Sequence, residues 1–237
     1  MSVPEGRESD LPRLILVRHG QASLGSQDYD RLSELGQRQA ARTGQRLASI
    51  LADRPALWSG THRRHHQTAL ALAPGSVPMD VPALNEFSTF SLIRAAVMQA
   101  DQIGLERPED AVLADPGQHL QHLLDWFPNV LGAWQDGRLA ASDIDPWSDF
   151  LQRVMSPVAD WHEALTAGQS VVVISSAGVI SSLVAELTGR GLDYQRQLAV
   201  TMYNASVSEL YLVEDIWHSV RVNCIEHLDA DGMGTLA

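Results

Sequence analysis

The sequence predicts an α/β protein, a three-layer α/β/α sandwich with a mainly parallel central sheet and a helical cap insertion. Residues 13–19 and 171–175 are short runs rich in valine, isoleucine and leucine, which are typical of strands buried on both faces. A helical period follows each run, and alternating strands and helices favour a parallel sheet with right-handed crossovers. Residues 88–147, rich in proline, tryptophan and polar residues, interrupt the alternation. We expect them to form the cap within a single domain, residues 1–237.

The first part of the chain alternates between strand-like apolar runs and segments with a helical period. From Ser33 to Leu51 apolar residues recur every three or four positions, which indicates an amphipathic helix. Ser33 is a good N-cap residue, and Pro74-Gly75 is a stop signal for the next helix. The predicted elements are a strand at 13–19, a helix at 33–51 capped by Ser33, a strand at 56–59 and a helix at 61–73 capped by Thr61.

The last part of the chain repeats the alternation and ends in a hairpin. An amphipathic pattern at 147–165 predicts a helix, which Pro157 should kink. The strand at 171–175 leads directly into a helix that Gly189 ends. The segments SVSELYLVE and HSVRVNCIEHL are predicted to pair as two strands around a turn at Glu214-Asp215.

Charge and composition exclude several classes of function. The formal net charge of −12 and the pI near 5.0 repel nucleic acid and anionic lipid, so neither is an expected partner. A single cysteine, Cys224, excludes an internal disulfide and a thiolate metal cage. The start of the chain lacks the apolar run of a signal peptide, and the longest apolar run, 171–187, is broken by four serines and a glycine. We therefore expect a cytoplasmic protein with no membrane span.

Polar residues gather where three of the predicted strands end. In an open α/β sheet, ligands bind outside the carboxyl ends of the strands, and helix N-termini at those ends can meet an anion. A neutral imidazole can accept a phosphoryl group, and a guanidinium can bind its oxygens in a fork. The residues at the three ends are Arg18-His19-Gly20, Ser59-Gly60-Thr61 and Ser175-Ser176-Ala177. They indicate a phosphate-handling nucleophile.

Four sequence elements, in the right order, resemble the histidine phosphatase superfamily, the phosphoglycerate mutase-like branch 1. LILVRHGQAS followed by LSELGQRQA resembles the family's opening, and in SGTHRRHHQTA an arginine, Arg64, stands three residues before Gln-Thr-Ala. LNEF, at 84–87, resembles the family's Leu-Asn/Arg-Glu element. NASVSEL and NCIEHL resemble its last strands. The resemblance covers about residues 13–228.

The resemblance implies a phosphatase that hydrolyses a small phosphomonoester through a phosphohistidine. His19 attacks phosphorus in such an enzyme, and Glu86 protonates the departing alcohol and then activates water. A carboxylic acid in that role is worth about 10²- to 10⁴-fold in rate. No metal or cofactor is implied, because arginines stabilise the charge. The candidate phosphate-binding residues are Arg18, Arg64, Ser176 and Gln21.

One position departs from the family pattern. The family usually has Ser-His-Gly-Gly where this chain has residues 175–178, Ser-Ser-Ala-Gly, so that Ser176 replaces the second active-site histidine. A hydroxyl donates a hydrogen bond but no charge, and losing one preorganised donor typically costs about 10²- to 10³-fold in rate. The histidines that could fill the gap are His62 and His65, beside Arg64, and His119 and His122, in the cap. The spacings His62/His66 and His119/His122 also suit two metal ligands, but no third ligand accompanies them.

Two hypotheses of different class follow. The first is a phosphatase using His19, slowed by Ser176; the second is a catalytically defective relative that binds a phosphorylated ligand or a protein partner. Phosphoglycerate mutase activity is a weaker alternative, since FSTFSL after LNE does not resemble the mutase continuation. We expect the cap to set specificity, its aromatic residues Trp126, Phe127 and Trp134 forming either an apolar substrate wall or core. The terminal strands offer a sheet edge for a homodimer.

Overall fold

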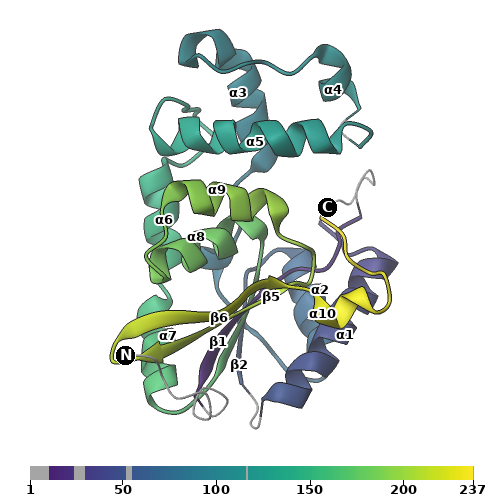
Figure 1. Ribbon diagram of the computed structural model, residues 1–237, viewed down its shortest axis with the longest axis vertical. Coiled ribbons are helices and arrows are strands. Elements are labelled where there is room, and N and C mark those ends of the chain that lie inside the picture. The colour runs from purple at the N-terminus through teal and green to yellow at the C-terminus, as the bar shows by residue number, and fades with distance from the viewer. Residues whose placement is uncertain (1–10, 24–29, 52–54, 116, 237) are drawn as a thin grey trace.

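A six-stranded sheet organises the computed structural model, which describes residues 11–23, 30–51, 55–115 and 117–236 (Figure 1). The strand order is β3-β2-β4-β1-β5-β6. Neighbours from β3 to β1 are parallel, and the pairs β1/β5 and β5/β6 are antiparallel. The predicted α/β class with a mainly parallel sheet is confirmed. The strands are β1 (Arg13–Arg18), β2 (Ala56–Ser59), β3 (Met79–Asp80), β4 (Val171–Ser175), β5 (Val207–Val213) and β6 (Ile216–Cys224).

Helices cover both faces of the sheet and form a separate group at one end of the molecule (Figure 1). Helices α1 (Glu34–Ile50) and α2 (Arg63–Leu72) lie on one face; α7 (Val158–Thr166) and α8 (Ala177–Leu187) lie on the other. Helices α6 (Trp147–Met155) and α9 (Leu192–Thr201) pack against α8, and the short α10 (Glu226–Asp229) packs beside α1. The cap segment, residues 88–147, contains α3 (Thr89–Ile103), α4 (Asp110–Ala114) and α5 (Leu120–Gln135).

Side chains that alternate along the central strands contribute to two hydrophobic cores, one on each face of the sheet. Leu14 and Leu16 belong to the larger buried cluster, together with residues of α8, whereas Ile15 and Val17 belong to a smaller cluster with Leu47 of α1. Successive side chains of a strand point to opposite faces, so an unbroken apolar run feeds both cores. This explains why the run at 13–19 reads as a strand and why the layers form a sandwich.

Ser33 is confirmed as a helix cap, and two other helix predictions need correction. Ser33 caps α1 by accepting a hydrogen bond from the Gly36 N–H at 3.0 Å, as predicted. The prediction that Thr61 caps α2 is wrong: the N-cap is His62, which makes no side-chain capping bond. The predicted helix at 147–165 is not merely kinked but divided, into α6 and α7, because Pro157 cannot continue the hydrogen-bond ladder.

The terminal hairpin turns where the sequence predicts, but the second predicted strand is too long: β6 ends at Cys224, and Glu226, His227 and Leu228 belong to α10. Glu214 and Asp215 lie between β5 and β6 and both have positive φ, 49° and 62°. Two successive residues in this left-handed region are typical of a type I′ turn, whose twist matches that of paired strands.

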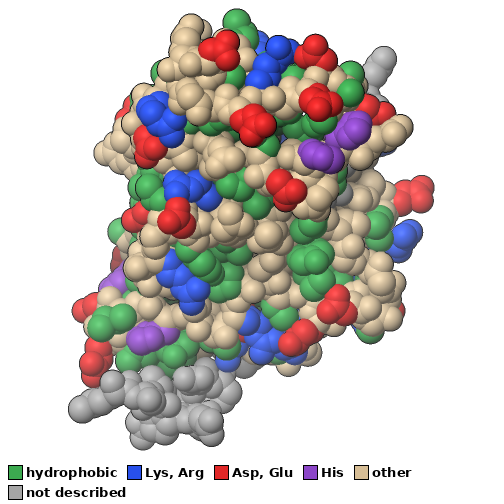
Figure 2. Space-filling view, turned by 45° about the horizontal axis from the view of Figure 1, so that its top comes forward, with side chains coloured by type: hydrophobic (Ala, Val, Ile, Leu, Met, Phe, Trp, Pro, Cys, Tyr) green, Lys and Arg blue, Asp and Glu red, His purple; other side chains and the backbone are tan. Residues whose placement is uncertain are grey.

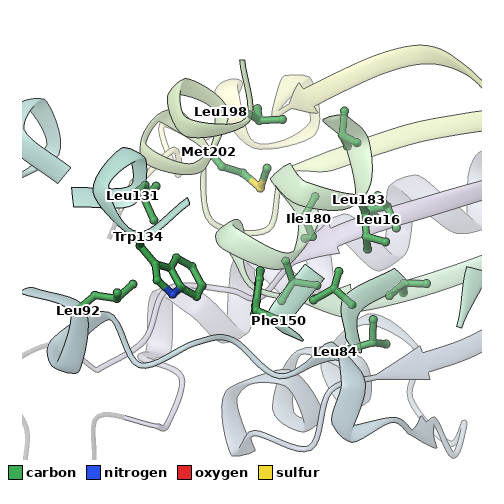
Figure 3. Packing of buried hydrophobic residues seen from close by; sticks show 14 of the residues in the cluster. Leu16, Leu84, Leu92, Leu131, Trp134, Phe150, Ile180, Leu183, Leu198 and Met202 are labelled. Atoms are coloured by element: carbon green, nitrogen blue, oxygen red, sulfur yellow. The ribbon is translucent and has the colours of Figure 1, made fainter. Parts of the chain in front are cut away.

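The aromatic residues of the cap segment are mostly core. Trp126 and Trp134 are buried, and their indole N–H groups donate to the backbone carbonyls of Glu106 and Asp145 at 2.6 and 2.9 Å. In Figure 3, Trp134 lies among Leu92, Leu131 and Phe150, and its ring is centred 5.4 Å from that of Phe150. The two indoles therefore join the cap segment to the main core, which favours the core interpretation over that of a substrate wall.

Among the described residues, no helix is both long and apolar enough to cross a membrane. On the face shown in Figure 2, acidic and basic side chains are interspersed.

Candidate active site

The carboxyl ends of three parallel strands meet at one edge of the sheet. In the register, Arg18 of β1 lies opposite Ser175 of β4. The His19 N–H donates to the Ser175 carbonyl at 2.9 Å, and the Gly60 N–H, just past β2, donates to the Ile174 carbonyl at 3.1 Å. Residues that follow these strands are therefore brought together, as expected from the rule for parallel sheets.

His19 is a buried, neutral imidazole. Its side chain is 6% exposed, and Nδ1 lies 2.7 Å from the Gly20 carbonyl oxygen. A carbonyl only accepts, so Nδ1 carries the hydrogen and Nε2 keeps its lone pair. Burial, and then the charges of Arg18 and Arg64, hold the pKa of His19 well below its usual value of 6.5. The geometry leaves an uncharged nitrogen available as a nucleophile.

Asp30 orients Arg64. The Arg64 Nη1 donates to Asp30 Oδ1 at 2.6 Å, and the other carboxylate oxygen of Asp30 accepts the Arg63 N–H at 2.8 Å. The Arg64 Nη2 lies 3.4 Å from Ser176 Oγ, which places the guanidinium across the ends of β2 and β4. Sequence reasoning missed Asp30, because this aspartate belongs to none of the motifs that carry the resemblance.

Arg18 is held by the last part of the described chain. Its Nη1 donates to the backbone carbonyl of Met202 and, at 2.7 Å, to that of Leu236. Its charge nevertheless contributes to the pKa of both His19 and Glu86. Arg18 is therefore part of the electrostatic environment of the candidate site.

Glu86 reaches the start of α8. Its Oε2 accepts the Gly178 N–H at 2.7 Å, and Oε1 accepts the Phe87 N–H at 3.2 Å. Burial raises the pKa of Glu86, against the opposing effects of the Gly178 bond and of Arg64. The preceding residue, Asn85, fixes this turn by exchanging two 2.7 Å hydrogen bonds with Thr61.

We expect Gly178→Ala to displace Glu86. A Cβ at position 178 would lie 2.5 Å from Glu86 Oε1 and 2.3 Å from the Phe87 ring, so one of these groups must move. Misplacing a catalytic group by about 1 Å can cost 10²-fold. If Glu86 is the proton donor that the resemblance implies, steady-state kinetics with an alkyl phosphate should show a kcat about tenfold to a hundredfold lower, whereas Gly191→Ala, with open space around it, should leave kcat unchanged. Equal kcat values for the two variants would contradict this steric role of Gly178.

Gln21 lies at the start of the loop before α1. Its side-chain Oε1 accepts the Ser33 hydroxyl at 2.8 Å, and its backbone N–H donates to Gln39 Oε1 at 2.8 Å. The structure thus joins Gln21 to the N-cap of α1, and its role in phosphate binding stays a prediction.

Ser176 and His65 form a buried pair. Ser176, at the N-cap of α8, places Oγ 2.8 Å from His65 Nε2, and both side chains are buried. The other candidate from α2, His62, packs edge-on against the His65 ring at 5.2 Å. His119 and His122 contact each other at the start of α5, in the cap segment. Of the four candidate histidines, His65 is the one that contacts Ser176.

The part of the chain that the structure describes contains no group of three histidine, cysteine or carboxylate side chains arranged to hold a metal ion.

The free energy of unfolding should fall in acid. Burial is the largest cause that holds the pKa values of His19 and His65 well below 6.5. The unfolded chain, whose histidines have their ordinary pKa, therefore takes up protons first as the pH falls below about 6.5, at a cost of up to about 1.4 kcal/mol per pH unit for each histidine. Urea unfolding between about pH 7.5 and 5.5 should show the fall. It should be weaker in His65→Gln, and a curve as steep as that of wild type would contradict this.

The chain belongs to the histidine phosphatase superfamily, branch 1, whose family model matches residues 14–110 and 114–225. YhfR of Bacillus stearothermophilus has a similar structure, with a TM-score of 0.63 and 21% identity over 91% of this chain and 98% of that one. A mycobacterial glucosyl-3-phosphoglycerate phosphatase in complex with inorganic phosphate is 23% identical, with a TM-score of 0.61 over 92% and 99% of the two chains. The α-ribazole phosphatase from Shigella flexneri is 19% identical, with a TM-score of 0.61 over 90% and 96%. The sequence finds no significant match among curated proteins.

Proposed function

We propose that the protein hydrolyses a small phosphomonoester through a phosphohistidine intermediate on His19. The observation that carries the proposal is the state of His19, a buried neutral imidazole whose Nδ1–H is bound to Gly20. The charges of Arg18 and Arg64 help to lower the pKa of His19. The same two charges act on Glu86, whose pKa is nevertheless raised by burial. The proposal thus takes His19 as the nucleophile, Arg64, which lies beside Ser176, as the anion-binding group, and Glu86 as the acid, with Arg18 adding its charge.

The proposed reaction has two steps. In the first, His19 Nε2 forms a bond to phosphorus, the bond from phosphorus to the ester oxygen breaks, and protonated Glu86 gives its proton to the leaving alkoxide. In the second, the Glu86 carboxylate takes a proton from water, whose oxygen attacks phosphorus and releases His19 and inorganic phosphate. Arg64 stabilises the charge on the phosphoryl oxygens in both steps, so the mechanism invokes no metal ion or cofactor.

The names of the related structures suggest substrates to test. One relative is named as a glucosyl-3-phosphoglycerate phosphatase and another as an α-ribazole phosphatase. We infer a small phosphorylated substrate of this general kind, and the cap segment, residues 88–147, as the part of the chain that selects it.

Phosphate release from a panel of monoesters tests the proposal. The panel contains p-nitrophenyl phosphate, sugar phosphates, phosphoglycerates and a riboside 5′-phosphate, each assayed with and without a chelator. Release that is insensitive to the chelator supports the proposal. If no monoester yields phosphate or a phosphoenzyme, the proposal fails, and the binding of a phosphorylated ligand by a catalytically defective relative, which Ser176 in the histidine position favours, takes its place.

A further inference from the structure

The imidazole of His65 lies beside the position at which the family usually has its second histidine. His65 Nε2 is 2.8 Å from Ser176 Oγ, and the rings of His65 and His19 are centred 5.6 Å apart. His65 comes from α2, however, whereas Ser176 is in the turn between β4 and α8. A serine at position 176 and a histidine at position 65 thus place an imidazole near the nucleophile from a different element.

Gly60 provides the space that the His65 ring occupies. A Cβ at position 60 would lie 2.3 Å from His65 Nδ1 and 2.9 Å from the Leu84 carbonyl oxygen, so no other residue fits while the ring is there. The ring is fully buried, and its Nδ1 has no hydrogen-bond partner among the described residues. An unpaired buried nitrogen costs free energy and calls for an explanation. The contact of the other ring nitrogen, Nε2, with Ser176 Oγ is the polar interaction that orients the ring.

The other hydrogen bond of Ser176 bears on which group donates in its contact with His65. A guanidinium only donates, so Ser176 Oγ accepts from Arg64 Nη2 at 3.4 Å. When His65 Nε2 carries the ring hydrogen, it donates to the second lone pair of the same oxygen, and the unpaired Nδ1 is left without a hydrogen. Both acceptor sites of the hydroxyl are then filled, and its own hydrogen must point elsewhere.

We propose that His65 is a positioning residue that, together with Arg64, holds the Ser176 hydroxyl so that it donates to the transferring phosphoryl group. The inference rests on the proposed function and adds to it a residue to which the family resemblance assigns no role. No bond to His65 forms or breaks; the imidazole restricts where the Ser176 hydrogen points. Preorganised donors of this kind are effective because they need no reorganisation during the reaction.

A reciprocal exchange tests the proposal. The variants are His65→Ala, the double variant His65→Ala/Ser176→His, and His66→Ala as a matched control from the same helix, where His66 faces Asp80. Each is assayed for kcat and KM with p-nitrophenyl phosphate, for the Kd of inorganic phosphate, and for thermal unfolding.

We expect His65→Ala to lower kcat about tenfold to a hundredfold, less than the 10²- to 10³-fold typical of losing a donor outright. The Kd of phosphate should rise several-fold, and KM should change less than kcat. The double variant places an imidazole at position 176 and vacates the space that it needs, so kcat should recover to within about tenfold of wild type. The control should match wild type in both kcat and Kd.

A further variant tests the inference in case the double variant does not fold. His65→Gln retains an amide N–H that can donate to Ser176, and it should keep more of kcat than His65→Ala. A purely structural role for His65 predicts lower thermal stability with unchanged kcat and Kd in the folded variants, which would overturn the inference while leaving the proposed function intact. If wild type has no turnover, the proposed function fails, and the phosphate Kd alone decides: equal values in wild type and His65→Ala would overturn the inference, and weaker binding in His65→Ala would support it.

Discussion

Replacing His19 with alanine is expected to abolish phosphate release and phosphoenzyme formation together. The reason is chemical: the other groups at the site bind charge or move protons, and the Nε2 lone pair of His19 is the proposed nucleophile. We expect kcat to fall by more than about 10³-fold, because losing a nucleophile removes the pathway rather than one stabilising contact. The affinity for inorganic phosphate should change much less, since Arg64 remains in place.

The measurement is a paired assay on wild type and His19→Ala. Rapid quenching with a labelled monoester should trap a phosphoenzyme in wild type that acid hydrolyses, as expected for a nitrogen–phosphorus bond, and none in the variant. The control is His66→Ala, which removes a half-exposed histidine from α2. Phosphate release that persists in His19→Ala, or a phosphoenzyme on another residue, would refute the assignment of His19 as nucleophile.

The strand pattern is the part of the fold that sequence predicts best. The predicted strands at 56–59 and 171–175 have the bounds that the structure gives. The signal is strongest for β4, which is buried throughout, because such a parallel strand must be apolar on both faces. Two elements had no such signal. The edge strand β3 pairs through only two residues, Met79 and Asp80, and α9 buries the polar Gln195, which donates to the Ser181 hydroxyl at 2.9 Å. Neither element shows an apolar period that a sequence could reveal.

The residues of the candidate site likewise fall into those that the sequence identifies and those that only the fold brings together. Motif residues such as Glu86 could be named from the sequence, because they stand at fixed distances from recognisable neighbours along the chain. The partner of Ser176 could not be chosen, since four histidines were open and the choice depends on the phase of α2 and on the space beside Gly60. Asp30 gave no signal at all, because its pairing with Arg64 is purely tertiary. Sequence therefore indicates which groups are present, and packing decides which of them meet.

Replacing Glu86 with glutamine should slow the formation of the phosphoenzyme in proportion to how poorly the alcohol leaves. With an alkyl phosphate the alkoxide needs a proton as it departs, so the loss of the acid should cost about 10²- to 10⁴-fold. With p-nitrophenyl phosphate the leaving phenolate is stable without a proton, and the formation of the phosphoenzyme should slow far less. Glutamine keeps the size of the side chain and its acceptor oxygen for the Gly178 N–H, so the fold of this turn should be retained.

The pH dependence of Glu86→Gln gives a second, independent readout. Burial raises the pKa of Glu86, so the carboxyl group stays protonated, and able to donate, to a higher pH than an ordinary glutamate. In wild type the rate with an alkyl phosphate should therefore fall as the pH rises through this raised pKa, because the acid form is lost. Glutamine does not titrate, so the variant should be slow at every pH and lack the alkaline fall that belongs to residue 86. If the two pH profiles have the same shape, or if phosphoenzyme formation slows equally with the two esters, Glu86 is not the proton donor.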